Sequence, residues 1–268
     1  MQLVPTRFPM FDLQWQIEFR KHFPYNWKKF STFEIRIMPP FSDQPDKPAK
    51  YAISQETRSA LLAAATEVFL EHGLRAARVQ DIAERAGIRL SAISYHFGGK
   101  EALYLAVLQQ HAEAAIAHMP IAPPDPGLPL KERFAFFVRA LAYRMLDEDS
   151  PSRIGQLLVR EVISPTPALD VMFERFTKPQ AQVLFGLIKE ILGARTPPKV
   201  LLRAMLSVVG QCMMYRVGMP MVERLSPGFQ QRKGWLDEVV AHVIEFSWAG
   251  LQAMAVTDGR EVRKGKFS

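Results

Sequence analysis

The 268-residue sequence contains a single cysteine, Cys212. One chain therefore cannot form an internal disulfide, and a cysteine-rich zinc site is excluded as well. Such low cysteine usage is typical of proteins from a reducing compartment, and we expect this protein to reside in the cytoplasm.

Long apolar runs and targeting signals are also missing. No apolar run reaches the roughly 18 residues that a membrane-spanning helix needs, so we expect no membrane partner. The N-terminus has no apolar segment followed by a small-residue cleavage site, and no secretory signal is predicted.

Enzyme motifs are missing too. The sequence has no GxSxG, GxGxxG or Walker motif and no histidine near Cys212. His111 and His118 could help to bind a metal, but two exposed histidines on one helix face are usually just solvated. We therefore expect no catalysis, no metal and no cofactor.

The residues that are present describe a globular chain with an excess of positive charge. Hydrophobic residues make up 48% and charged residues 23% of the sequence, which is enough apolar material for a core. The formal net charge is +7, and this balance favours polyanionic partners without indicating a fold.

Helical periodicity begins at Ser54, and no strand-like alternation of useful length follows. Leu61, Ala65 and Val68 have the i, i+4, i+7 spacing of one buried stripe, and Gly73 is expected to end that helix. Ser54 with Thr57 offers capping near the helix start. These patterns predict an all-α fold.

The second half of the chain predicts further helices with prolines at their boundaries. Pro220 and Pro227 are expected to flank a loop. The expected helices there cover residues 131–146, 152–163, 167–192, 198–216 and 234–255, and a long helix is expected before them at residues 100–118.

The stretch RVQDIAERAGIRLSAISYHFGGKEALY, residues 78–104, has the layout of a helix-turn-helix. Two short helical patterns meet at Ala86-Gly87-Ile88, and in such a motif the second helix lies in the major groove of DNA. Placing Ile93 at the centre of the inward face puts Leu90 and Phe97 on the same side. A structural three-helix element with an unused outer face fits the spacing equally well.

The outer face of this second helix is small and polar. Its hydroxyls can donate to or accept from base edges, and basic and aromatic residues around it suit phosphate contacts. The predicted DNA-binding residues are Arg58, Arg78, Val79, Arg89, Leu90, Ser91, Ala92, Ser94, Tyr95, His96 and Lys100.

The run ALLAAATEVFLEHGLRAARVQDIAERAGIRLSAISYHFGGKEALY resembles the DNA-binding domain of the TetR family of bacterial transcriptional regulators. The resemblance covers about residues 55–105, and its most specific part is ISYHFGGKEALY. It implies that Tyr95, His96 and Lys100 contact the DNA backbone. It also implies that Ser91, Ala92 and Ser94 read bases.

This chain departs from the family pattern at two positions. Arg78 stands where the family usually has Ser or Thr, so we expect another group to cap the second helix and Arg78 to make a stronger charge contact. Leu90 stands where many members carry a polar residue.

The resemblance further implies a helical C-terminal domain that binds a small molecule and forms a homodimer. The segment LVREVISPTPALDVMFERFTKPQ, residues 158–180, resembles the subfamily of the cefoperazone and chloramphenicol sensitivity regulator. Ordinary core packing remains the alternative for each residue of the expected ligand site. These residues are Phe137, Tyr143, Met145, Arg160, Met172, Phe173, Phe176, Gln211 and Tyr215.

The last two helices are expected to form a four-helix dimer interface, as the resemblance implies, with burial inside one chain as the alternative. Its expected residues are Ala204, Val208, Cys212, Val239, Val243, Phe246 and Ala249.

The domain prediction has four parts: an N-terminal extension at 1–50, the helix-turn-helix domain at 51–100, the ligand-binding and dimerisation domain at 101–256, and a basic tail at 257–268. The first 37 residues could be an upstream extension before a true start at Met38, a basic arm that holds DNA, or a membrane-surface helix. We expect a transcriptional repressor that releases operator DNA when it binds a small hydrophobic or drug-like molecule. A structural adaptor is the remaining alternative, and it would lack the salt dependence of DNA binding.

Overall fold

The computed structural model describes residues 48–121 and 127–258. The predictions for residues 1–47 and 259–268 lie outside the described residues. Two ends of the described part differ from expectation, because the first helix already begins at Pro48 and the last runs to Asp258.

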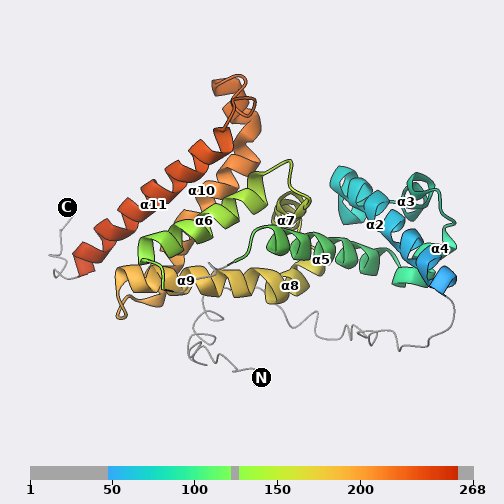
Figure 1. Cartoon of the computed structure of the whole chain (residues 1–268), viewed down its shortest axis with the longest axis horizontal. Helices are drawn as coiled ribbons and strands as arrows, with labels where there is room; N and C mark the ends of the chain where they lie inside the picture. The colour runs from blue at the N-terminus through green and yellow to red at the C-terminus, as the bar shows by residue number, and fades with distance from the viewer. Residues whose placement is uncertain (1–47, 122–126, 259–268) are drawn as a thin grey trace, which may run out of the picture. The chain divides into compact units, whose positions relative to one another are not determined.

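All regular elements in the described part of the chain are helices, which confirms the all-α prediction (Figure 1). Their bounds are α2 Pro48–Ala76, α3 Val79–Ala86, α4 Ser91–Phe97, α5 Lys100–His118, α6 Leu130–Leu146, α7 Ile154–Ile163, α8 Ala168–Met172, the π-helical segment Phe173–Thr177, α9 Lys178–Leu192, α10 Pro198–Leu225 and α11 Trp235–Asp258.

Glycine and proline explain most differences from the expected boundaries. Gly73 breaks the helical conformation inside α2 with φ 70° and ψ 172°, as its predicted role as a stop requires. Ser54 and Thr57 lie within α2, so the predicted cap at its start is wrong. α10 continues through Pro220 to Leu225, and the loop lies beyond it, because a helix can pass a proline at the cost of one backbone hydrogen bond.

The first hydrophobic core joins the helix-turn-helix to part of the second half of the chain. Leu61, Phe69 and Ile82 of the N-terminal helices pack in one cluster with Leu157 of α7 and Met172 of α8. The packing therefore continues across residue 100, and α7 and α8 belong to the core that supports the helix-turn-helix.

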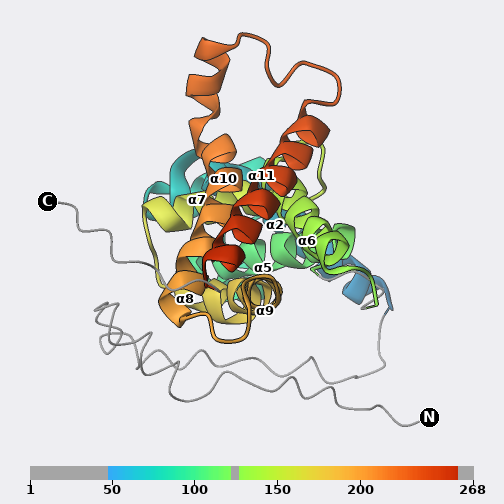
Figure 2. The same ribbon diagram turned by 90° about the vertical axis from the view of Figure 1, so that its left-hand side faces the viewer.

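The second core is built from α6, α9, α10 and α11, and α11 packs against the other three (Figure 2). It contains five of the seven residues that were expected at a dimer interface: Ala204, Val208, Cys212, Val239 and Val243. These five are buried within their own chain, so the alternative of simple burial is correct for them. Phe246 and Ala249 are exposed.

By length and composition alone, α10 is long and apolar enough to cross a membrane. One of its faces, which includes Leu201 and Cys212, packs in the second core. Leu206, Met214, Val217, Met221 and Leu225 of the same helix are exposed.

Candidate DNA-binding site

The turn between α3 and α4 is set by Gly87, whose backbone is left-handed with φ 65° and ψ 28°. Its N–H donates to the carbonyl of Glu84 at 3.0 Å, and the Ile88 N–H donates to that of Ala83 at 3.0 Å. A side chain at Gly87 would strain this conformation. The turn fixes the direction in which α4 leaves α3.

The inward face of α4 is narrower than the sequence predicts. Ile93 is 2% exposed and Phe97 packs beside it against the first core. Leu90 is 45% exposed, so its predicted place on the inward face is wrong; α4 begins only at Ser91. Ala92 is partly buried against the core, which leaves it less accessible than the predicted outer face requires.

The outward face of α4 carries exposed Ser91, Ser94 and Tyr95, and Tyr95 is 79% exposed. Its ring meets that of His96 edge-on, with 4.9 Å between centroids. Arg89 and Arg78 are also exposed beside this face. The arrangement combines hydroxyls that can reach base edges with guanidinium groups that can reach phosphates.

Two of the predicted DNA contacts also brace the motif. The Arg58 guanidinium donates to the carbonyl of His96 at 3.4 Å and lies 4.5 Å from the centre of the Phe97 ring. The Lys100 ammonium donates to the carbonyls of Arg75 and Ala77, at 3.4 and 3.1 Å. Neither role was predicted, because each links residues 23 or more positions apart.

Helix α3 is anchored without a side-chain cap. Arg78 occupies the N-cap position with an extended backbone and makes no capping hydrogen bond through its side chain, which remains exposed. Val79 is partly buried against the first core. Arg85 donates two hydrogen bonds to Glu71 of α2, at 2.7 and 3.0 Å, and holds the pKa of Glu71 below its ordinary value. This pair ties α3 to α2.

The residues predicted to bind a ligand are spread over both cores. Phe137 is buried in the second core and Met172 in the first, whereas Phe173 is exposed. Met145 packs against the second core and Phe176 against the first, both partly buried.

The polar members of that predicted set already have partners. The Tyr143 hydroxyl donates to Asp237 at 2.6 Å, and Gln211 donates to the Ser247 hydroxyl at 2.8 Å. The Tyr215 ring stacks on a neighbouring aromatic ring. Arg160 lines a cavity of about 530 Å³, together with residues that the sequence did not indicate because they come from distant helices.

The predicted exposure of His111 is wrong. His111 is 8% exposed and its ring contacts α2 and the start of α7, whereas His118 is exposed. No cluster of three metal-ligating side chains occurs among the described residues.

A short helix pair with an exposed polar face, joined to a helical second half, defines a helix-turn-helix transcriptional regulator. The chain belongs to the TetR family. Residues 61–107 match the model of the bacterial regulatory proteins of the tetR family. Residues 130–251 match the model of the C-terminal domain of the HTH-type transcriptional dual regulator CecR.

Individual relatives agree with these matches. The dual regulator CecR of Shigella flexneri is 27% identical over 182 residues, which cover 65% of this chain and 81% of that protein. The transcriptional activator FasR of Mycolicibacterium smegmatis is 45% identical over 62 residues, 23% of this chain and 28% of that protein. The crystal structure of a tetR-family regulatory protein from Rhodococcus RHA1 has a TM-score of 0.54 at 20% identity, covers 73% of this chain and 96% of its own, and supports the fold. These matches confirm the prediction that the chain is a TetR-family protein and the prediction that it is a transcriptional regulator and not an enzyme.

Proposed function

We propose that the protein is a homodimeric repressor that occupies operator DNA and releases it on binding a small molecule. The outward face of α4 carries this proposal: Ser91, Ser94 and Tyr95 are exposed, while Ile93 holds the helix on the core. In this arrangement α4 enters the major groove, the serines meet base edges, and Arg78, Arg89 and Tyr95 meet phosphates. The protein acts in the cytoplasm, where bacterial operator DNA lies.

Dimerisation is supported by an apolar stripe on the outward side of α10 and α11. Leu206, Met214, Val217 and Met221 are exposed and lie on one side of α10, because their spacing follows the helical repeat. Phe246 of α11 is 65% exposed. Exposed apolar side chains gathered on one side of a helix mark a protein interface, and a two-fold copy would bury them in a four-helix contact.

The dimer places two copies of α4 against two half-sites of a palindromic operator. A small molecule that binds better to a state with another spacing between the two helices shifts the population away from DNA. The relatives' names include a dual regulator and an activator, so the sign of regulation needs a direct test.

The function is tested by mapping the DNA sites of the protein across its source genome and then transcribing a mapped promoter in vitro. We expect discrete palindromic sites and less transcript when the protein is added. More transcript would contradict repression, and the absence of discrete sites would contradict operator binding.

The interface is tested with Met214→Glu and Phe246→Glu, which place a carboxylate on the apolar stripe. Light scattering after gel filtration should give the mass of a dimer for the parent chain and of a monomer for both variants, because a charge buried without a partner is costly. Val162→Glu, at an exposed apolar residue of α7 outside the stripe, is the control and should remain dimeric. If the Met214→Glu and Phe246→Glu variants remain dimeric, the dimer interface does not lie on this stripe.

A further inference from the structure

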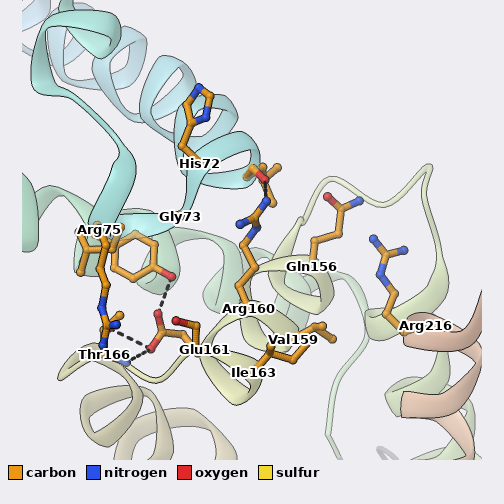
Figure 3. Close-up of a pocket in the computed structure, with 14 residues that line it drawn as sticks. His72, Gly73, Arg75, Gln156, Val159, Arg160, Glu161, Ile163, Thr166 and Arg216 are labelled. Carbon is orange, nitrogen blue, oxygen red and sulfur yellow. Dashed lines mark hydrogen bonds between the residues drawn. The ribbon is translucent and has the colours of Figure 1, made fainter.

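A cavity of about 530 Å³ is lined by residues of α2, α5, α7 and α10 and of the loop that follows α7 (Figure 3). Apolar side chains, including Leu70, Leu74 and Val159, form part of its lining. This volume is within the range of small-molecule sites, and an apolar lining with a few polar groups is their usual composition.

The charged groups of the cavity are mainly cationic. Arg75, Arg160 and Arg216 come from α2, α7 and α10 (Figure 3). The carboxylate in the lining is Glu161, which is 1% exposed and accepts hydrogen bonds from the Tyr104 hydroxyl at 2.7 Å and the Thr166 hydroxyl at 2.9 Å. Its oxygens are thus engaged within the protein, and the lining keeps an excess of positive charge.

Arg216 is largely sequestered, since its side chain is 17% exposed. Its ion pair with Glu148 is long, at 3.5 Å, and the partner is 61% exposed. Burial lowers the pKa of Arg216, so its charged form lacks full compensation in the folded chain. An anionic ligand in the cavity would supply that compensation.

Arg160 connects the cavity to the DNA-binding helices. Its guanidinium donates to the carbonyls of Leu70 and Glu71, in the last turn of α2 before the break at Gly73. Carbonyls at a helix end have no partners within the helix, so an arginine there satisfies them. The next residue, Glu161, accepts a hydrogen bond from Tyr104 of α5. Helix α7 is therefore hydrogen-bonded both to α2, which precedes the helix-turn-helix, and to α5, which follows it.

We propose that this cavity is the effector site, that it takes an organic carboxylate with an apolar body, and that the ligand draws Arg160 away from the end of α2. A carboxylate forms stronger hydrogen bonds with a guanidinium than a neutral carbonyl does, so it competes for the same donors. The loss of this brace loosens the α2–α3 junction and changes the position of α4. The inference rests on the proposed regulation of DNA binding by a small molecule.

Isothermal titration of the full chain tests the ligand class with 2-naphthoate, 2-naphthalenemethanol and inorganic phosphate. The proposal predicts that 2-naphthoate binds about tenfold or more tightly than the matched alcohol. It also predicts that phosphate alone binds more weakly than 2-naphthoate, because it has no apolar body. Equal binding of naphthoate and alcohol, stronger binding of phosphate, or no binding of naphthoate at millimolar concentration would each overturn it.

The location is tested with Arg216→Gln, which removes a cavity cation whose ion pair is with Glu148 and not with α2. The affinity for 2-naphthoate should fall about tenfold. Arg139→Gln is the matched control, because Arg139 is exposed on α6, pairs with Asp237 and does not line the cavity. Equal affinities of these two variants would place the ligand elsewhere.

Hydrogen exchange tests the link to α2. Saturation with 2-naphthoate should speed exchange of the amides of residues 74–77, which follow the braced turn, and unchanged exchange would refute the competition for Arg160. These measurements need no DNA. A chain that binds naphthoate but no operator would overturn the proposed function alone, whereas a chain that binds operator but no naphthoate would overturn this inference alone.

Discussion

A pH-dependent loss of stability follows from the environment of His111. The Nδ1 atom of its ring accepts a hydrogen bond from the backbone N–H of Arg153 at 3.1 Å. An N–H can only donate, so Nδ1 carries no proton and Nε2 carries it in the neutral ring. The Nε2–H donates to the Thr66 hydroxyl at 3.1 Å, which donates in turn to the carbonyl of Leu62 at 2.8 Å.

Protonation of His111 would turn Nδ1 into a second hydrogen-bond donor opposite the N–H of Arg153, and it would place a charge in a buried site. Burial, with a smaller contribution from the charge of Arg153, lowers the pKa of His111 below 6.5 in the folded state. The unfolded chain therefore binds the proton more readily. The stabilising contribution is complete above about pH 6.5 and is lost as the pH falls from there toward the folded pKa.

Linkage limits the size of this effect to one proton. Between pH 7.5 and pH 5.5 the free energy of unfolding falls by at most about 1.4 kcal/mol through this histidine, the limit reached when the folded pKa lies well below 5.5. Urea unfolding at several pH values measures it. His111→Gln should flatten the profile between these pH values, and His118→Gln, at an exposed position of the same helix, should leave it unchanged. Parallel profiles for the parent chain and His111→Gln would refute the reasoning.

Two further predictions use the same unfolding assay. Gly73→Ala should lower the free energy of unfolding by about 1–3 kcal/mol, because φ 70° with ψ 172° is accessible almost only to glycine. Gly186→Ala is the control, since Gly186 lies in α9 with open space around it, and this change should raise the free energy of unfolding by up to about 1 kcal/mol. Equal effects of the two glycine changes would contradict the strain at Gly73. Glu161→Gln should lower the free energy of unfolding by about 1–3 kcal/mol, because the charged acceptor of the Tyr104 hydroxyl is lost. An unchanged midpoint of urea unfolding would contradict a stabilising role of this hydrogen bond between α7 and α5.

Local sequence rules predict the helix-turn-helix well because its decisive features are local. Gly87 supplies the left-handed turn, and Ile93 marks the buried side of α4. The expected α5, residues 100–118, matches the structure at both ends. Leu90 was misplaced because periodicity extends a face beyond the helix end without detecting where the helix begins.

The packing of the second half is harder to predict from the sequence, because α10 is apolar on two sides. Val208 and Cys212 fill the core while Leu206 and Met214 face outward, and the sequence pattern does not distinguish the two faces. The bonds of Arg160 to α2 span about 90 positions, so no spacing rule could reveal them.

The central claim is that the outward face of α4 binds operator DNA. Fluorescence anisotropy with labelled operator DNA over a range of salt concentrations tests this claim most directly. The logarithm of the binding constant should fall linearly with the logarithm of the salt concentration, because phosphate neutralisation releases counterions. Arg89→Ala should weaken binding and reduce that slope by about one, Tyr95→Ala should weaken binding to all DNA, and Ser91→Ala should change the preference between operator and altered sequences. Arg175→Ala, at an exposed arginine of the π-helical segment, is the control and should behave like the parent chain. If the parent chain shows no salt dependence, or if the Arg89, Tyr95 and Ser91 variants bind as it does, α4 is not the DNA-reading helix.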